Sequence, residues 1–125
     1  MAKILLIDDE IEWLDLCREH LESLGHEVKA VNCGADALTM TTFDPPDAVV
    51  LDVLMPIGGR MMLATIRRCW PDVPVVIHTA YGESDDPGLA TADAFVIKST
   101  NLAKLGDTLE RVLQGRVISQ RDQRD

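Results

Sequence analysis

The sequence has 125 residues, 46% of them hydrophobic, and a formal net charge of −9. A chain of this length fits one domain with a substantial buried core and leaves no room for a second. The negative charge argues against direct binding of nucleic-acid phosphates and favours a divalent cation or a basic protein as the partner.

The first residues and the cysteines bear on where the protein works. Met1 to Lys3 leads directly into a short apolar run that ends at Asp8, so neither a signal peptide nor a membrane segment is expected. The 3 cysteines lack close ligand spacing, which fits reduced thiols better than a disulfide framework or a zinc site. We therefore expect a soluble, cytoplasmic protein.

The first part of the chain alternates short apolar runs with amphipathic segments. Ile4 to Ile7 is a continuous apolar run closed by acids, which is typical of a buried parallel strand. Apolar residues at helical spacing then predict a helix from Ile11 to Leu24, closed by Gly25. Glu27 to Val31 alternates polar and apolar residues and predicts a half-exposed edge strand, and Asp36 to Phe43 predicts a short helix.

The rest of the chain continues this alternation. Ala48 to Leu51 is a second continuous apolar run, which leads straight into Asp52, and Pro56 prevents a longer strand. The elements predicted after it are a helix over Met62 to Trp70, a strand over Val75 to Thr79, a strand over Ala94 to Ile97 and a helix over Leu102 to Leu113. We expect a domain over residues 1–114, followed by a polar, frayed tail or linker stub over residues 115–125.

Five strands alternating with helices predict an α/β fold. The expected architecture is a doubly wound, five-stranded parallel sheet of flavodoxin-like order 2-1-3-4-5, with right-handed crossovers. In such a sheet the carboxyl ends of the strands share one edge, where ligands bind. The predicted strand ends bring together Asp8, Asp9, Asp52, Thr79 and Lys98, which are far apart in the sequence.

These residue types suit phosphoryl chemistry. Three neighbouring carboxylates repel one another unless a hard dication neutralises them, and Mg²⁺ is the natural candidate because it prefers oxygen ligands. An ammonium from Lys98 and a hydroxyl from Thr79 would meet an incoming phosphoryl group, and the reacting oxygen would be that of Asp52. Each acid taken singly could equally be a helix cap, but the combination at several strand ends favours a site.

The chain resembles the CheY-like receiver domains of bacterial two-component response regulators over about residues 3–114. The motifs that carry the resemblance are Ile7-Asp8-Asp9-Glu10, Leu51-Asp52-Val53-Leu54-Met55-Pro56, Thr79-Ala80 and Lys98. It implies that Asp52 is the phosphoacceptor and that Thr79 and Lys98 contact the phosphoryl oxygens. It also implies that Mg²⁺ is held by Asp8, Asp9 and Asp52, together with the main-chain carbonyl of Leu54.

The resemblance also implies a switch and its partners. A histidine kinase or histidine phosphotransfer protein would supply the phosphoryl group, Thr79 would move inward, and the ring of Phe95 would fill the vacated space. A downstream effector protein or domain would respond, and a homodimer is compatible with the family. Such a chain is not an enzyme with turnover, since it promotes only its own phosphorylation and dephosphorylation at Asp52.

Two departures from the family pattern leave alternatives open. The segment between Ala80 and Phe95 is shorter than usual by about one helical turn, so we expect only a short or irregular helix near Asp85 to Gly88. Ser99 follows Lys98, where the family usually has a cis proline, and therefore favours a trans peptide bond.

These departures permit a second interpretation, a receiver-like interaction module that no longer switches. A third is a small phosphohydrolase with an aspartyl nucleophile. Those enzymes resemble a pattern with two acids one residue apart on the nucleophile strand, whereas Asp52 is followed by Val53 and Leu54. We rank the switch first.

Overall fold

The computed structural model describes residues 2–32, 45–52, 59–80, 91–99 and 101–124. Within these ranges the strands are β1 (Lys3–Ile7), β2 (Glu27–Val31), β3 (Ala48–Leu51), β4 (Val75–Thr79) and β5 (Ala94–Ile97). The helices are α1 (Ile11–Ser23), α3 (Gly59–Cys69) and α4 (Ala103–Arg124). The strands form one 5-stranded parallel sheet in the order β2-β1-β3-β4-β5, which confirms the predicted fold and strand order.

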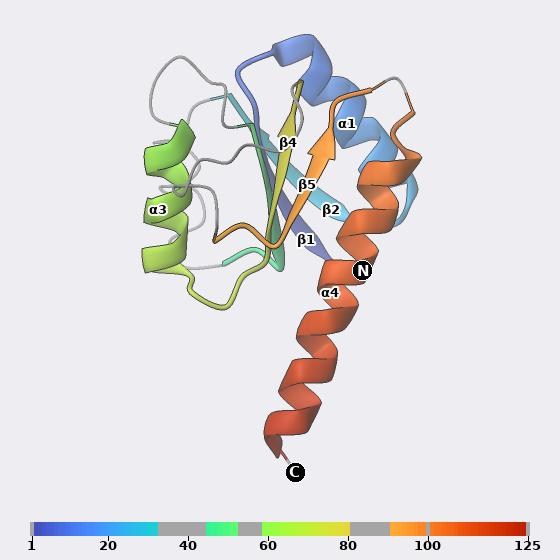
Figure 1. Cartoon of the computed structure of the whole chain (residues 1–125). Coiled ribbons are helices and arrows are strands. Elements are labelled where there is room, and N and C mark those ends of the chain that lie inside the picture. The colour runs from blue at the N-terminus through green and yellow to red at the C-terminus, as the bar shows by residue number, and fades with distance from the viewer. Residues whose placement is uncertain (1, 33–44, 53–58, 81–90, 100, 125) are drawn as a thin grey trace.

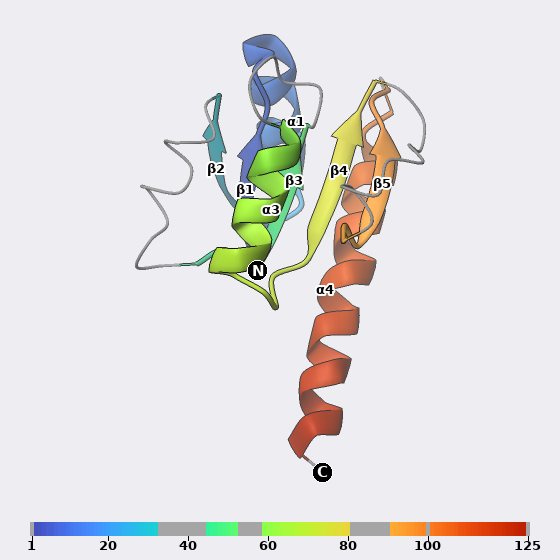
Figure 2. The ribbon, with the colours of Figure 1, turned by 60° about the vertical axis from the view of Figure 1, so that its left-hand side comes forward.

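Helices cover both faces of the sheet, with α1 and α4 on one face and α3 on the other (Figure 2). Alternate residues of β1 point to opposite faces: Ile4 and Leu6 join the core under α1 and α4, whereas Leu5 and Ile7 join the core under α3. Both faces of the strand are therefore buried, which explains why its sequence is continuously apolar.

The edge strand β2 and the end of helix α1 also agree with the sequence predictions. Strand β2 is at one edge and its first four residues are exposed or half buried, as the polar and apolar alternation predicts. Helix α1 buries Leu14, Cys17 and Leu21 and gives way to Gly25, whose positive φ of 95° closes the helix as expected.

The C-terminal segment differs from its prediction. Instead of fraying after residue 114, the backbone of α4 continues as helix to Arg124 and extends past the sheet (Figure 1). The segment contains no proline and is rich in arginine and glutamine, and each residue added to an existing helix costs little compared with nucleation. Whether these residues act as a tail or linker separate from the domain stays a prediction.

Some expectations concern residues outside the described ranges, and others concern the peptide bond after Lys98 or a membrane segment. The helix over Asp36 to Phe43 and the short helix near Asp85 to Gly88 lie outside the described residues, as does Leu54. No cis peptide bond occurs among the described residues, so Lys98 and Ser99 are joined in trans, as the sequence predicts. In the same part of the chain, no helix combines the length and the apolar character that crossing a bilayer requires.

Two leucines of α1 test the assigned core. Leu21 is fully buried, whereas Leu16 on the same helix is 46% exposed. We expect Leu21→Ala to lower the free energy of unfolding by about 2–5 kcal/mol, because it leaves a cavity in the core under α1 and α4. Leu16→Ala should cost less than about 1 kcal/mol. Urea unfolding of both variants measures the difference, and equal losses would contradict this packing.

Candidate functional site

Backbone hydrogen bonds continue the ladder one residue beyond the strands and align the charged residues at one edge. The N–H of Asp52 donates to the carbonyl of Ile7 at 3.0 Å, and the N–H of Lys98 donates to the carbonyl of Thr79 at 2.6 Å. Asp8 directly follows Ile7, so it leaves β1 beside Asp52. The carboxyl ends of β1, β3, β4 and β5 therefore meet at one site.

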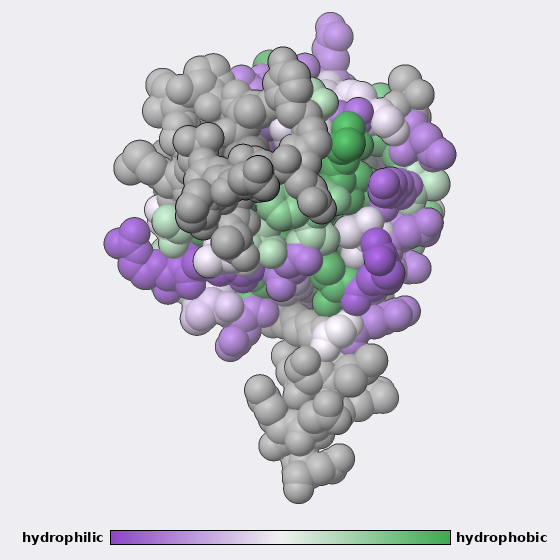
Figure 3. All heavy atoms as spheres, viewed as in Figure 1, coloured by the Kyte–Doolittle hydropathy of each residue, from purple (hydrophilic) through white to green (hydrophobic). Residues whose placement is uncertain are grey.

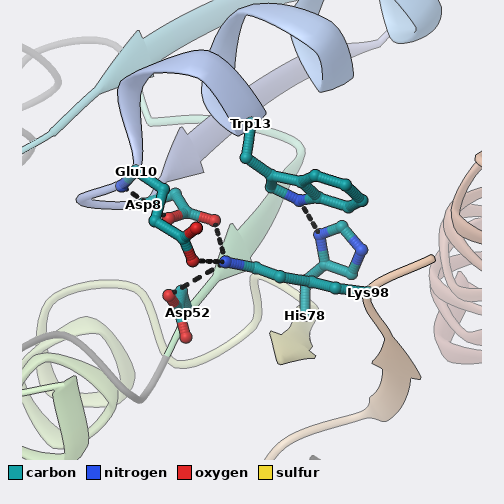
Figure 4. Close-up of polar contacts among 6 residues, drawn as sticks. All are labelled: Asp8, Glu10, Trp13, Asp52, His78 and Lys98. Carbon is teal, nitrogen blue, oxygen red and sulfur yellow. Dashed lines mark hydrogen bonds and ion pairs between the residues drawn. The ribbon is translucent and has the colours of Figure 1, made fainter. Parts of the chain in front are cut away.

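The ammonium of Lys98 lies among three carboxylates (Figure 4). Its Nζ is 2.8 Å from Asp8 Oδ2, 2.9 Å from Glu10 Oε1 and 3.2 Å from Asp52 Oδ2. The side chains of Lys98, Asp8 and Asp52 are only 8%, 2% and 4% exposed. A buried ammonium needs such partners, because an isolated charge in the protein interior is strongly unfavourable.

Burial and charge pull the pKa values of this cluster in opposite directions. Burial raises the pKa of Asp8 and the charge of Asp52 adds to the rise, while Lys98 and the N–H of Glu10 counteract it. Burial by itself would lower the pKa of Lys98, but hydrogen bonds from its ammonium to Asp8 and Glu10 outweigh burial and raise the pKa. Lys98 is therefore held in its charged form.

Glu10 is a site residue that the sequence analysis missed. It occupies the N-cap position of α1, yet its side chain makes no capping hydrogen bond and pairs with Lys98 instead. Asp8 provides the side-chain hydrogen bond just before the helix, because its Oδ1 accepts the N–H of Glu10 at 2.9 Å. The run Asp8-Asp9-Glu10 was the available signal, but an acid at a helix start is ordinarily explained by its attraction to the helix dipole.

The acids also form a set of oxygen donors. Asp8, Asp9, Glu10 and Asp52 can each offer one carboxylate oxygen, all within 4.8 Å of one another. Asp8 and Asp52 are buried, while Asp9 and Glu10 face solvent. Hard dications prefer oxygen ligands and keep several waters, so this half-open, all-oxygen set fits one.

Thr79 and Phe95 lie on the neighbouring strands. Thr79 is the last residue of β4, is 5% exposed, and pairs in register with Ile97, next to Lys98. Phe95 lies further back along β5 and packs half buried against the core under α3. The predicted residues Asp8, Asp9, Asp52 and Lys98 are thus together, with Thr79 on the strand beside them and Phe95 apart.

Two rings complete the surroundings of Lys98. The ring of Trp13 lies 5.7 Å from Lys98 Nζ, and its indole N–H donates a long, 3.5 Å hydrogen bond to Nδ1 of His78. His78 is 2% exposed and is one of the few buried polar side chains of the described residues. Burial, together with the charge of Lys98, lowers its pKa from 6.5 to about 4. Trp13, which the sequence analysis did not assign to the site, therefore faces it.

Comparison with known proteins agrees with this arrangement. Residues 4–110 match the family described as the response regulator receiver domain. The chain belongs to this family. As a receiver domain it is 35% identical over 118 residues to the transcriptional regulatory protein PrrA of Mycobacterium tuberculosis, a match that covers 91% of this chain and 51% of PrrA. It is 34% identical to the probable transcriptional regulator ycf27 of Cyanophora paradoxa, covering 90% of this chain and 48% of that protein.

Solved receiver structures share the fold. The response regulator TrrA of Thermotoga maritima, crystallised with Mg²⁺-BeF, superposes with a TM-score of 0.83 at 32% identity and covers 90% of this receiver domain and 99% of TrrA. TrrA has also been crystallised with the histidine kinase ThkA. The chemotaxis protein CheY4 of Vibrio cholerae superposes with a TM-score of 0.82 at 28% identity, covering 90% of this chain and 98% of CheY4. This receiver domain spans about half the length of PrrA and of ycf27.

The low pKa of His78 predicts a specific pH dependence. Between about 4 and 6.5 the unfolded chain binds a proton at His78 that the folded chain does not, so the stability due to this residue is lost as the pH falls. Between pH 7.5 and pH 5 the loss should be about 2 kcal/mol. Urea unfolding should show this loss in the wild type, and His78→Leu should lack it.

The difference between wild type and His78→Leu isolates the effect of His78, because the pH-dependent contributions of the other titrating groups are present in both proteins. Leu16→Ala, on the exposed side of α1, changes no titratable group; it is the matched control and should follow the wild type. An identical change with pH in wild type and His78→Leu would contradict the assignment.

Proposed function

We propose that this receiver domain accepts a phosphoryl group on Asp52 and uses it to switch an interaction surface. The observation that carries the proposal is the Lys98 ammonium, held 3.2 Å from Asp52 within a group of four acids. A carboxylate is a weak nucleophile toward a charged phosphoryl group, and a fixed ammonium beside it reduces the repulsion.

In the proposed phosphoryl transfer, Asp52, Lys98 and Thr79 would have different roles. An Asp52 oxygen attacks phosphorus, the bond from phosphorus to the donor breaks, and the electron pair of that bond leaves with the donor. Lys98 then pairs with a phosphoryl oxygen, and the Thr79 hydroxyl donates to another. For a histidine kinase or phosphotransfer protein, the leaving group is a neutral imidazole after it gains a proton.

Asp8, Asp9 and Asp52, with the main-chain carbonyl of Leu54, would hold Mg²⁺. The set of carboxylate oxygens within 4.8 Å supports this assignment, as does the Mg²⁺-BeF complex of TrrA. When bound, the ion would neutralise charge on the carboxylates and on the phosphoryl oxygens. The chain contributes the spacing of these acids and the lysine that keeps them together in the metal-free state.

The output surface would lie over β5. Hydrophobic side chains gather over this strand in Figure 3, and Ile97 is 51% exposed. Phe95 is the proposed switch residue, because it lies on this strand two residues before the one that pairs with Thr79. The upstream partner would be a histidine kinase or phosphotransfer protein, as for TrrA with ThkA, and the downstream partner an effector protein or domain. Homodimerisation and a cytoplasmic location stay predictions.

A receiver that binds partners without switching is the main alternative, since Ser99 replaces the usual proline. Phosphorylation separates the two functions: a switch should move the backbone NMR signals of β5, whereas a constitutive module should show changes only beside Asp52. Turnover of a phosphate ester would instead support the phosphohydrolase interpretation. We expect no such turnover, because Asp52 is followed by Val53 and Leu54 and not by a second acid; the chain would promote only its own phosphorylation and dephosphorylation.

Metal binding gives the first test. Mg²⁺ that binds the folded chain should raise the midpoint of thermal unfolding as its concentration increases. Asp9→Asn should weaken the apparent affinity at least about tenfold, because it removes one charged oxygen ligand. Glu19→Gln, an exposed acid of α1 outside the cluster, is the matched control. Equal affinities for Asp9→Asn and wild type would contradict the ligand assignment.

Phosphorylation gives the second test. After incubation with acetyl phosphate and Mg²⁺, intact mass spectrometry should show one added phosphoryl group on the wild type and on Asp72→Asn, an exposed acid away from the site. Asp52→Asn should gain none, because an amide oxygen cannot form the acyl phosphate. Labelling of Asp52→Asn to the wild-type level, or failure of the wild type to react, would overturn the proposal.

A further inference from the structure

Lys98 contacts carboxylates on one side and aromatic rings on the other. In Figure 4 the carboxylates surround the end of the side chain, while the rings of Trp13 and His78 lie along its other side. Trp13 belongs to the first turn of α1 and His78 to β4, so two elements contribute to this second contact. The rings are 5.6 Å apart and inclined by 40°, and they are joined by the hydrogen bond from indole to imidazole.

We infer that Trp13 is a positioning residue, which holds the Lys98 ammonium toward Asp52, and that His78 fixes the indole for this purpose. The inference rests on the proposed function, in which that ammonium meets the phosphoryl oxygens. The distance of 5.7 Å from Nζ to the ring is within the range of a cation–π contact, and tryptophan is the strongest of the aromatic partners.

The ring adds a second restraint on the lysine beside its ion pairs with the buried carboxylates of Asp8 and Asp52. The side chain has four rotatable bonds, and one of its partners, Glu10, is 64% exposed and free to follow it toward solvent. The Trp13 ring limits this movement. It also keeps water from the ammonium, so that the attraction between Lys98 and the carboxylates is less screened.

His78 is suited to orient the indole. The indole N–H can only donate, so its partner must present a lone pair, which Nδ1 provides when the imidazole is neutral. A protonated imidazole would have no acceptor for Trp13 and would repel Lys98. The buried position and the depressed pKa keep it neutral over the physiological range.

Trp13 also packs against the core under α1 and α4, so its contact with Lys98 must be separated from simple packing. Trp13→Phe keeps a weaker aromatic face and loses the N–H, while Trp13→Met keeps an apolar side chain without a ring. If packing alone matters, the phosphorylation rate should follow the loss of stability. If positioning matters, the phosphorylation rate should fall from tryptophan to phenylalanine to methionine, in the order of their attraction for the Lys98 ammonium.

The rate of phosphorylation by acetyl phosphate with Mg²⁺ distinguishes these cases. We expect a loss of about tenfold for Trp13→Met and about threefold for Trp13→Phe, at matched folded fractions checked by urea unfolding. His78→Leu should slow the reaction, and His78→Asn should restore much of the rate because its side-chain oxygen can accept the indole N–H. Trp70→Phe, which changes the tryptophan packed on the other face, should remain within about twofold of the wild type.

A spectroscopic measurement tests the contact without phosphoryl chemistry. The indole N–H signals in a ¹H–¹⁵N NMR spectrum can be assigned with Trp70→Phe. Lys98→Met and His78→Leu should each shift the Trp13 signal while leaving that of Trp70 in place. A Trp13 signal that is unchanged in both variants would overturn the inference.

The outcomes separate the inference from the function on which it rests. If the wild type is phosphorylated and Trp13→Met reacts at the same rate, the proposed function stands and the positioning role is wrong. If the wild type takes up no phosphoryl group, both are wrong, even where the NMR signals confirm the contact. A graded loss from tryptophan to phenylalanine to methionine, with rescue by His78→Asn, supports the inference.

Discussion

The ion pairs of Lys98 are the interaction on which the site depends. Four carboxylates within 4.8 Å of one another repel strongly, and a buried ammonium without partners would be equally unfavourable. The ammonium and the carboxylates therefore stabilise each other, and removing only the ammonium or only a carboxylate would leave uncompensated charge. One lysine does not balance all four acids, so the cluster keeps an excess of negative charge. That excess makes a dication a natural addition at the same place.

The parallel sheet creates this contact from residues that the sequence separates. Hydrogen bonds that continue the ladder by one residue set Asp52 beside β1 and Lys98 beside β4. Large apolar cores on both faces of the sheet fix the strands that carry them. The charged cluster adds little to the fold and depends on it, because the energetic cost of holding like charges together is met by hydrophobic burial elsewhere.

Strands and helices could be predicted because their signals are local: continuous apolar runs for the buried strands and helical spacing for α1. Convergence of Asp8, Asp52 and Lys98 followed from topology alone. Glu10 could not be assigned in the same way, because attraction to the helix dipole explains an acid at a helix start as well as an ion pair does. Trp13 was missed because its role depends on a lysine in a distant part of the sequence. The length of α4 was underestimated because few apolar residues mark its last turns.

A double-mutant cycle between Lys98 and Asp52 tests the central claim most directly. Unfolding free energies of the wild type, Lys98→Met, Asp52→Asn and the double variant would be measured in metal-free buffer. If the ammonium stabilises the carboxylate cluster as described, losing it should cost about 1–3 kcal/mol more when Asp52 is present than when asparagine replaces it. Costs that add to within about 0.5 kcal/mol would contradict the account.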